Sequence, residues 1–66
     1  MILGQRVVVR SRTGGTGASG GPEMTDVIGH VHALSADVIT LERRDGTLVD
    51  VRTSDIVTWK EVPPAP

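Results

Sequence analysis

A glycine-rich stretch near the N-terminus has the spacing of two anion-binding motifs. Residues 12–17 (RTGGTG) fit the pattern R-x-x-G-x-G, and residues 15–20 (GTGASG) fit G-x-G-x-x-G. Both patterns bind a pyrophosphate only where the loop leads into a helix, because the amide groups and dipole of the helix N-terminus hold the anion. Gly20, Gly21 and Pro22 stand where that helix would begin. We therefore expect a long mobile loop over residues 13–23 and no bound cofactor.

Two histidines, His30 and His32, form an H-x-H pair that could begin a metal site. Alternate residues of a strand project from the same face, so both imidazoles would be available to one ion. A zinc site needs three or four ligands, however. Asp26 is the one further candidate on that strand face. We expect histidines that face solvent and no metal.

Three arginines, Arg6, Arg10 and Arg12, would share one face of a strand, as a track for nucleic-acid phosphates requires. Proteins that bind single strands usually add several aromatic stacking platforms, whereas this chain has one tryptophan and no other aromatic residue. The formal net charge of −1 provides no long-range attraction either. Nucleic acid is therefore the weaker candidate partner. The possible interaction surface comprises Trp59, Arg6, Arg10, Arg12, His30 and His32.

Trp59 has two possible roles. If Val57 points inward, the alternation of a strand sends Trp59 inward too, where it would close one end of a small core that lacks Phe and Tyr. If the last strand is irregular, the indole lies on the surface and can anchor another domain or chain. We favour the first role.

The length and composition indicate one small all-β domain. The chain has 66 residues and no cysteine, which is compatible with a reducing cytoplasm and excludes stabilisation by disulfides. No apolar run reaches the roughly 18 residues of a membrane span. The apolar residues are mostly Val, Ile and Leu, and β-branched side chains favour strands.

Alternating apolar residues predict five strands, at residues 5–12, 26–34, 38–41, 47–53 and 57–62. Asp45-Gly46 supplies a tight hairpin turn. Thr53 or Ser54 would cap one helical turn before the last strand. Gly29 marks a bend or a close backbone approach in the second strand. This arrangement is typical of an SH3-like small barrel with a long glycine-rich first loop, whose closed sheet removes exposed edges.

The expected core follows from the strand faces. It comprises Val7, Val9, Val27, Val31, Leu34, Ile39, Leu41, Val49, Val51, Ile56 and Val57. At about 1.5–3 kcal/mol for each buried aliphatic side chain, a core of this size only narrowly outweighs the loss of chain entropy.

Several segments together resemble a known family. GQRVVVRSR, the glycine-rich loop, TDVIGHV, VITLERRDGTLVDV and SDIVTWKEVPPAP are similar to the small N-terminal barrel of actinobacterial GNAT-type N-acetyltransferases, some of which are labelled histone acetyltransferases. The resemblance implies a barrel at residues 1–62 and a Pro-rich linker at residues 63–66 that leads to an acetyl-CoA-dependent domain. R-x-x-G-x-G is the acetyl-CoA loop of that second domain, so no catalytic or acetyl-CoA residue carries over to this chain.

We therefore expect a non-catalytic, cytoplasmic accessory domain whose partner is the adjacent acetyltransferase domain. No serine has a base beside it in the expected strands and loops, so nucleophilic catalysis is not expected. The alternative is a free-standing small-barrel module that binds nucleic acid or a protein partner.

Overall fold

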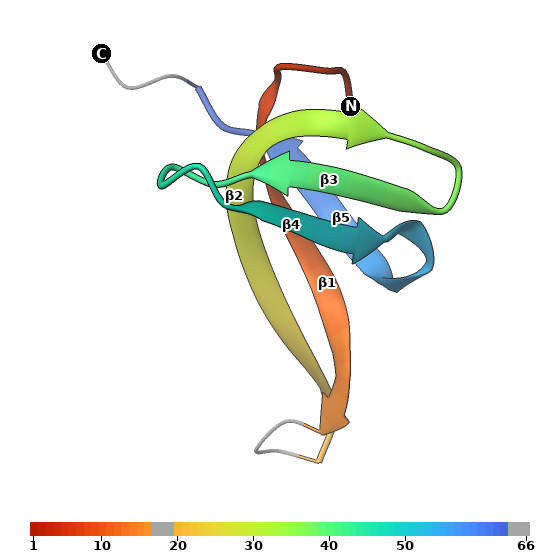
Figure 1. The fold of residues 1–66 in the computed structure, drawn as a ribbon. Coiled ribbons are helices and arrows are strands. Elements are labelled where there is room, and N and C mark those ends of the chain that lie inside the picture. Colours follow the sequence, from red (N-terminus) through yellow and green to blue (C-terminus); the bar gives the residue numbers. More distant parts are fainter. Residues whose placement is uncertain (17–19, 64–66) are drawn as a thin grey trace.

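A long, bent strand organises the fold. The computed structural model describes residues 1–16 and 20–63. The elements are β1 (Arg6–Thr16), β2 (Pro22–Leu34), β3 (Val38–Glu42), β4 (Leu48–Arg52), a 3-10 turn η1 (Thr53–Asp55) and β5 (Ile56–Glu61). The first half of β2 pairs with β1, and its last residues, from His30 to Leu34, pair with β3. Figure 1 shows β2 curving through a wide arc to reach both neighbours.

The five strands form one antiparallel sheet in the order β4-β3-β2-β1-β5. The all-β prediction is confirmed, with five strands and a helical turn before the last one. The expected closure into a barrel is wrong, because β4 and β5 end the strand order and are not paired with each other. The sheet is curved but open, and its two outer strands each keep one unpaired backbone edge.

Gly29 lies where the backbones of β2 and β3 approach most closely. A methyl group built at Gly29 would stand 2.6 Å from the carbonyl oxygen of Glu42 and 3.3 Å from Cβ of Leu41. Any side chain at this position would therefore push β3 away from β2. The expectation of a close backbone approach at Gly29 is confirmed.

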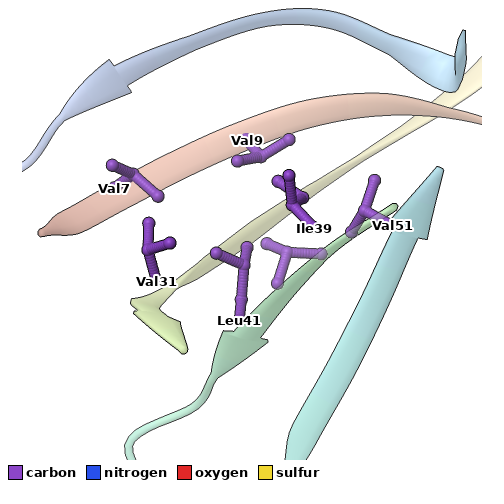
Figure 2. Close-up of a cluster of buried hydrophobic side chains, with 7 residues drawn as sticks. Val7, Val9, Val31, Ile39, Leu41 and Val51 are labelled. Carbon is purple, nitrogen blue, oxygen red and sulfur yellow. The ribbon is translucent and has the colours of Figure 1, made fainter. Parts of the chain in front are cut away.

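The core fills the concave side of the sheet, as Figure 2 shows. Its buried members are Val7, Val9, Val27, Val31, Ile39, Leu41 and Val51. Met1, Val49 and Ile56 are partly buried and pack against them. Two expected core residues are wrong: Leu34 and Val57 are each 43% exposed, because Leu34 ends β2 and Val57 falls at an irregularity of β5 described below.

The glycine-rich segment is a hairpin more than a loop. β1 continues to Thr16 and β2 begins at Pro22, so the expected loop at residues 13–23 is too long at both ends. The Thr13 hydroxyl donates a hydrogen bond of 2.6 Å to Oε1 of Glu23, across the hairpin. Residues 17–19, at its tip, lie outside the described residues. Strand pairing therefore extends on one side of this segment to Thr16 and on the other to Pro22.

The β3–β4 hairpin is closed by a turn at residues 43–46. The amide of Gly46 donates to the carbonyl of Arg43 at 2.9 Å, and Gly46 has a φ of +88°. Asp45 keeps a negative φ and accepts hydrogen bonds from the amide of Thr47 at 3.0 Å and from its hydroxyl at 2.7 Å. Only the glycine therefore needs the left-handed conformation here.

The 3-10 turn η1 leads from β4 into β5. The expected cap from Thr53 or Ser54 is wrong, because no side chain caps η1. The hydroxyl of Thr53 donates instead to the carbonyl of Ala36 at 2.9 Å, which ties the turn to the β2–β3 connection. Among residues 1–16 and 20–63, no helix is long and apolar enough to cross a membrane.

Candidate interaction surface

The convex side of the sheet, which we call the outer face, carries the residues that alternate with the buried valines. The register pairs Arg6 with His30, Val8 with Ile28, Arg10 with Asp26 and Arg12 with Met24. Directly opposed residues project from the same face of a sheet. Charged and apolar side chains therefore alternate along this face instead of forming separate patches.

A groove of about 370 Å³ opens on the outer face. It is lined by Val8, Arg10, Asp26, Thr58, Trp59 and Lys60. The strands β2, β1 and β5 each contribute to it, so the groove depends on strand pairing between residues far apart in the sequence. The lining combines an aliphatic side chain, an ion pair, a hydroxyl and an ammonium group, which suits a partner with both apolar and acidic groups.

One wall of the groove is a two-point ion pair between Arg10 and Asp26. Nε of Arg10 donates to Oδ1 of Asp26 at 3.0 Å, and Nη2 donates to Oδ2 at 3.2 Å. The hydrogen bonds from Arg10 lower the pKa of the Asp26 carboxyl, and those to Asp26 raise the pKa of Arg10. Both side chains are about half exposed, so solvent screens the attraction. The pair neutralises the central arginine of the expected phosphate track.

The other two arginines of that track are separated. Nη1 of Arg6 donates to the carbonyl of Pro63 at 3.3 Å. Arg12 lies six residues further along β1, which is about 20 Å in a strand, and it is opposite the exposed Met24. The structure therefore brings the three arginines onto one face, as expected, but places Val8 and a neutralised Arg10 between the outer two.

The two histidines are not part of the groove. His30 lies opposite Arg6 on one side and Glu42 on the other. The register of β2 with β3 shifts between Val31 and Ala33, so His32 falls at a bulge. Within residues 1–16 and 20–63, no group of three or more His, Cys, Asp or Glu side chains could hold a metal ion.

Trp59 lies in β5, one of the two edge strands. The register of β5 with β1 shifts after Arg10, so that Thr58 pairs with Arg10 and Ile56 with Ser11, leaving Val57 as an extra residue. This bulge breaks the expected link between Val57 and Trp59. The register places Trp59 opposite the buried Val9, yet the residue is 39% exposed and lines the groove, on an edge strand of the described sheet.

The hydrogen-bond pattern shows which backbone groups of β5 face away from β1. The amide of Val62 donates to the carbonyl of Arg6 at 2.9 Å, and bonded and non-bonded pairs alternate in antiparallel strands. The backbone groups of Trp59 and Glu61 therefore point away from β1. An unpaired edge of this kind can accept an extended segment of another chain.

Sequence reasoning missed four residues of the groove, namely Val8, Asp26, Thr58 and Lys60. The sequence identifies Asp26 only as a candidate metal ligand. The opposite charges of Arg10 and Asp26 were visible in the sequence, but their pairing depends on the register of the first hairpin. Thr58 and Lys60 join them only because β5 returns to pair with β1.

An open, five-stranded antiparallel sheet with a short 3-10 turn before its last strand defines a small all-β domain. The sequence matches the model of one such family over residues 1–60, and the chain belongs to this family, described as the Rv0428c N-terminal Sm-like domain. No curated protein and no solved structure matches the chain. The match supports the expected small β domain, described as Sm-like, and it shows no link to GNAT-type acetyltransferases.

Proposed function

We propose that this chain is a non-catalytic interaction domain that precedes a larger domain, and that the parent protein is a GNAT-type N-acetyltransferase. The family description supports the first part, since it refers to an N-terminal domain. The resemblance of segments such as TDVIGHV and SDIVTWKEVPPAP supports the second. The Pro-rich residues 63–66, of which 64–66 lie outside the described residues, would form a semi-rigid linker.

The observation that carries the binding role is the groove on the outer face. It lies beside Ile28 and Met24, which are 53% and 44% exposed. Apolar groups framed by charges are typical of protein-binding surfaces. Lys60 and the remaining donors of Arg10 would receive an acidic group of the partner, while Val8 and Ile28 would contact an aliphatic one. The proposed partner of this groove is therefore an acidic, partly apolar protein segment.

The glycine-rich hairpin supports a role without cofactor. Arg12 and Gly15 of the R-x-x-G-x-G pattern lie within β1, Gly17 lies outside the described residues, and Gly20 and Gly21 run directly into β2. Pyrophosphate binding by this motif needs several amides that converge at a helix start. An extended hairpin presents its amides to the neighbouring strand instead.

The test is a comparison of the parent protein with a variant that lacks residues 1–62. We expect the truncated protein to keep its affinity for acetyl-CoA and its rate of acetyl transfer to a small amine, because this domain supplies no catalytic group. Calorimetry and a transfer assay measure the two quantities. Loss of acetyl-CoA binding by a folded truncated protein would contradict the accessory role. An open reading frame that ends at Pro66 would leave the free-standing module as the remaining reading.

The alternative, a free-standing module that binds nucleic acid, makes a distinct prediction. Titration with a single-stranded RNA would then shift the amides of Arg6, Arg12 and Lys60, with an affinity that falls steeply as salt is raised. We expect no saturable shift, because Arg10 is paired and the chain has a formal net charge of −1.

A further inference from the structure

The first five residues form a fixed turn that displays two apolar side chains. The amide of Gln5 donates to the carbonyl of Ile2 at 3.2 Å, and the amide of Ile2 donates to Oε1 of Gln5 at 3.1 Å. Gly4, with a φ of +82°, takes the left-handed position that such a turn requires. Ile2 is 67% exposed and Leu3 is 63% exposed, which are the largest values among the exposed large apolar residues.

This N-terminal turn is held firmly against the sheet. The amide of Gly4 donates to the carbonyl of Val31 at 2.8 Å, and the amide of Val31 donates to the carbonyl of Gln5 at 2.9 Å. Met1 packs against the core. The exposure of Ile2 and Leu3 is therefore a feature of an ordered segment. A docking surface that is already ordered loses little conformational entropy when a partner binds.

The end of the described chain leaves the sheet beside this turn. Nε2 of Gln5 donates to Oε2 of Glu61 at 3.1 Å, and Nη1 of Arg6 donates to the carbonyl of Pro63 at 3.3 Å. Figure 1 shows the N-terminal segment and the end of β5 at the same end of the molecule. Because three residues advance a chain by at most about 10 Å, a domain placed after Pro66 would begin near the N-terminal turn.

We propose that Ile2 and Leu3 are the docking surface for the domain that follows Pro66 in the parent protein, which meets them with an apolar patch of its own. This inference rests on the proposed function, since it requires that a following domain exists. It assigns a second surface, separate from the groove: the groove binds a partner, whereas the N-terminal turn fixes the orientation of this domain on its own chain. Docking would be favourable, because it would remove the exposed side chains of Ile2 and Leu3 from water.

The first test measures solvent access in the parent protein itself. Methyl groups are labelled, and their relaxation enhancement by a soluble paramagnetic agent is recorded. Leu48, which is 54% exposed and lies outside the groove, is the internal control. We expect the methyl groups of Ile2 and Leu3 to show an enhancement several-fold smaller than those of Leu48. Equal enhancement would overturn the proposal.

The second test measures how the domains tumble. In the parent protein, amide relaxation of the five strands should report the rotational correlation time of the whole molecule. The double variant Ile2→Ser/Leu3→Ser should lower this time towards that of a free domain, and Leu48→Ser should leave it unchanged. Independent tumbling of the unaltered domain would overturn docking. Protection of Ile2 and Leu3 that disappears on dilution would assign them to a second copy of the chain instead. A gene that ends at Pro66 would refute the proposed function itself, because no following domain would then exist.

Discussion

The backbone of Glu42 lies so close to Gly29 that only a residue without a side chain fits at position 29. A Cβ at Gly29 would stand 2.6 Å from the backbone carbonyl oxygen of Glu42. A backbone atom in a paired strand cannot swing away as the end of a flexible side chain can. The bend of β2, and with it the pairing of β2 with β3, therefore depends on the missing side chain at Gly29.

The first prediction concerns this contact. Gly29→Ala should lower the free energy of unfolding by about 1–3 kcal/mol, the usual cost of overpacking a buried position, as measured by urea denaturation. Gly15→Ala is the matched control in a strand. Its added methyl group would stand 3.3 Å from Oε1 of Glu23, the end of a flexible side chain, so its effect should be smaller. Equal effects of the two substitutions would contradict the importance of the close approach.

The second prediction concerns backbone conformation without steric contact. Gly46 has a φ of +88°, and a side chain there would meet nothing within 4 Å. Gly46→Val should nevertheless destabilise the domain by more than about 1 kcal/mol, because a β-branched residue resists the left-handed region. Gly46→Asn should cost less, since Asn tolerates that region. Thermal unfolding of the three proteins distinguishes them, and an unchanged midpoint for the valine variant would show that the turn changes type.

The third prediction concerns the stability of the domain at acidic pH. Hydrogen bonds from Arg10 lower the pKa of Asp26, and those from Thr47 lower the pKa of Asp45, relative to the ordinary value of 3.8. A carboxyl with a lowered pKa in the folded state contributes stability that is fully present above its unfolded pKa. That contribution is lost as the pH falls through the lowered folded value. Stability should therefore be level near neutral pH and decrease below about pH 4.

Asp26→Asn tests the predicted direction in which stability changes with pH. The variant should be less stable than the unaltered chain at pH 7, and the difference should shrink as the pH falls through the lowered pKa of Asp26 in the folded state. Urea midpoints measured across this pH range give the comparison. A difference that stayed constant with pH would mean that the ionised carboxylate of Asp26 adds nothing to stability.

The fourth prediction concerns acetyl-CoA. The chain alone should give no saturable amide shifts when acetyl-CoA is added, despite its R-x-x-G-x-G match, because residues 12–16 are extended in β1. Ordering a new loop around the pyrophosphate would in addition cost about 1–2 kcal/mol for each residue fixed. Micromolar, saturable shifts at Gly14 and Gly15 would make this hairpin a cofactor site and refute the accessory role.

Local pattern determined the strands and the sides they bury. The alternation of Val7 and Val9 with Arg6, Val8 and Arg10 reveals which face of β1 is buried, because successive side chains of a strand point to opposite sides. The two glycines with structural roles, Gly29 and Gly46, could also be identified from the sequence. Each stands in a context, a strand interior or an Asp-Gly turn, in which the lack of a side chain has a local meaning.

Register and closure were decided by the tertiary structure. The bulge that leaves Val57 unpaired, and so separates it from Trp59, arises where β5 meets a strand more than forty residues away in sequence. No local pattern encodes such a shift, because its position depends on how β5 pairs with β1. Whether β4 and β5 meet depends likewise on the summed curvature of the sheet. The sequence therefore predicts which side of β1 is buried, whereas only the assembled sheet leaves Trp59 at an open edge and forms the groove beside it.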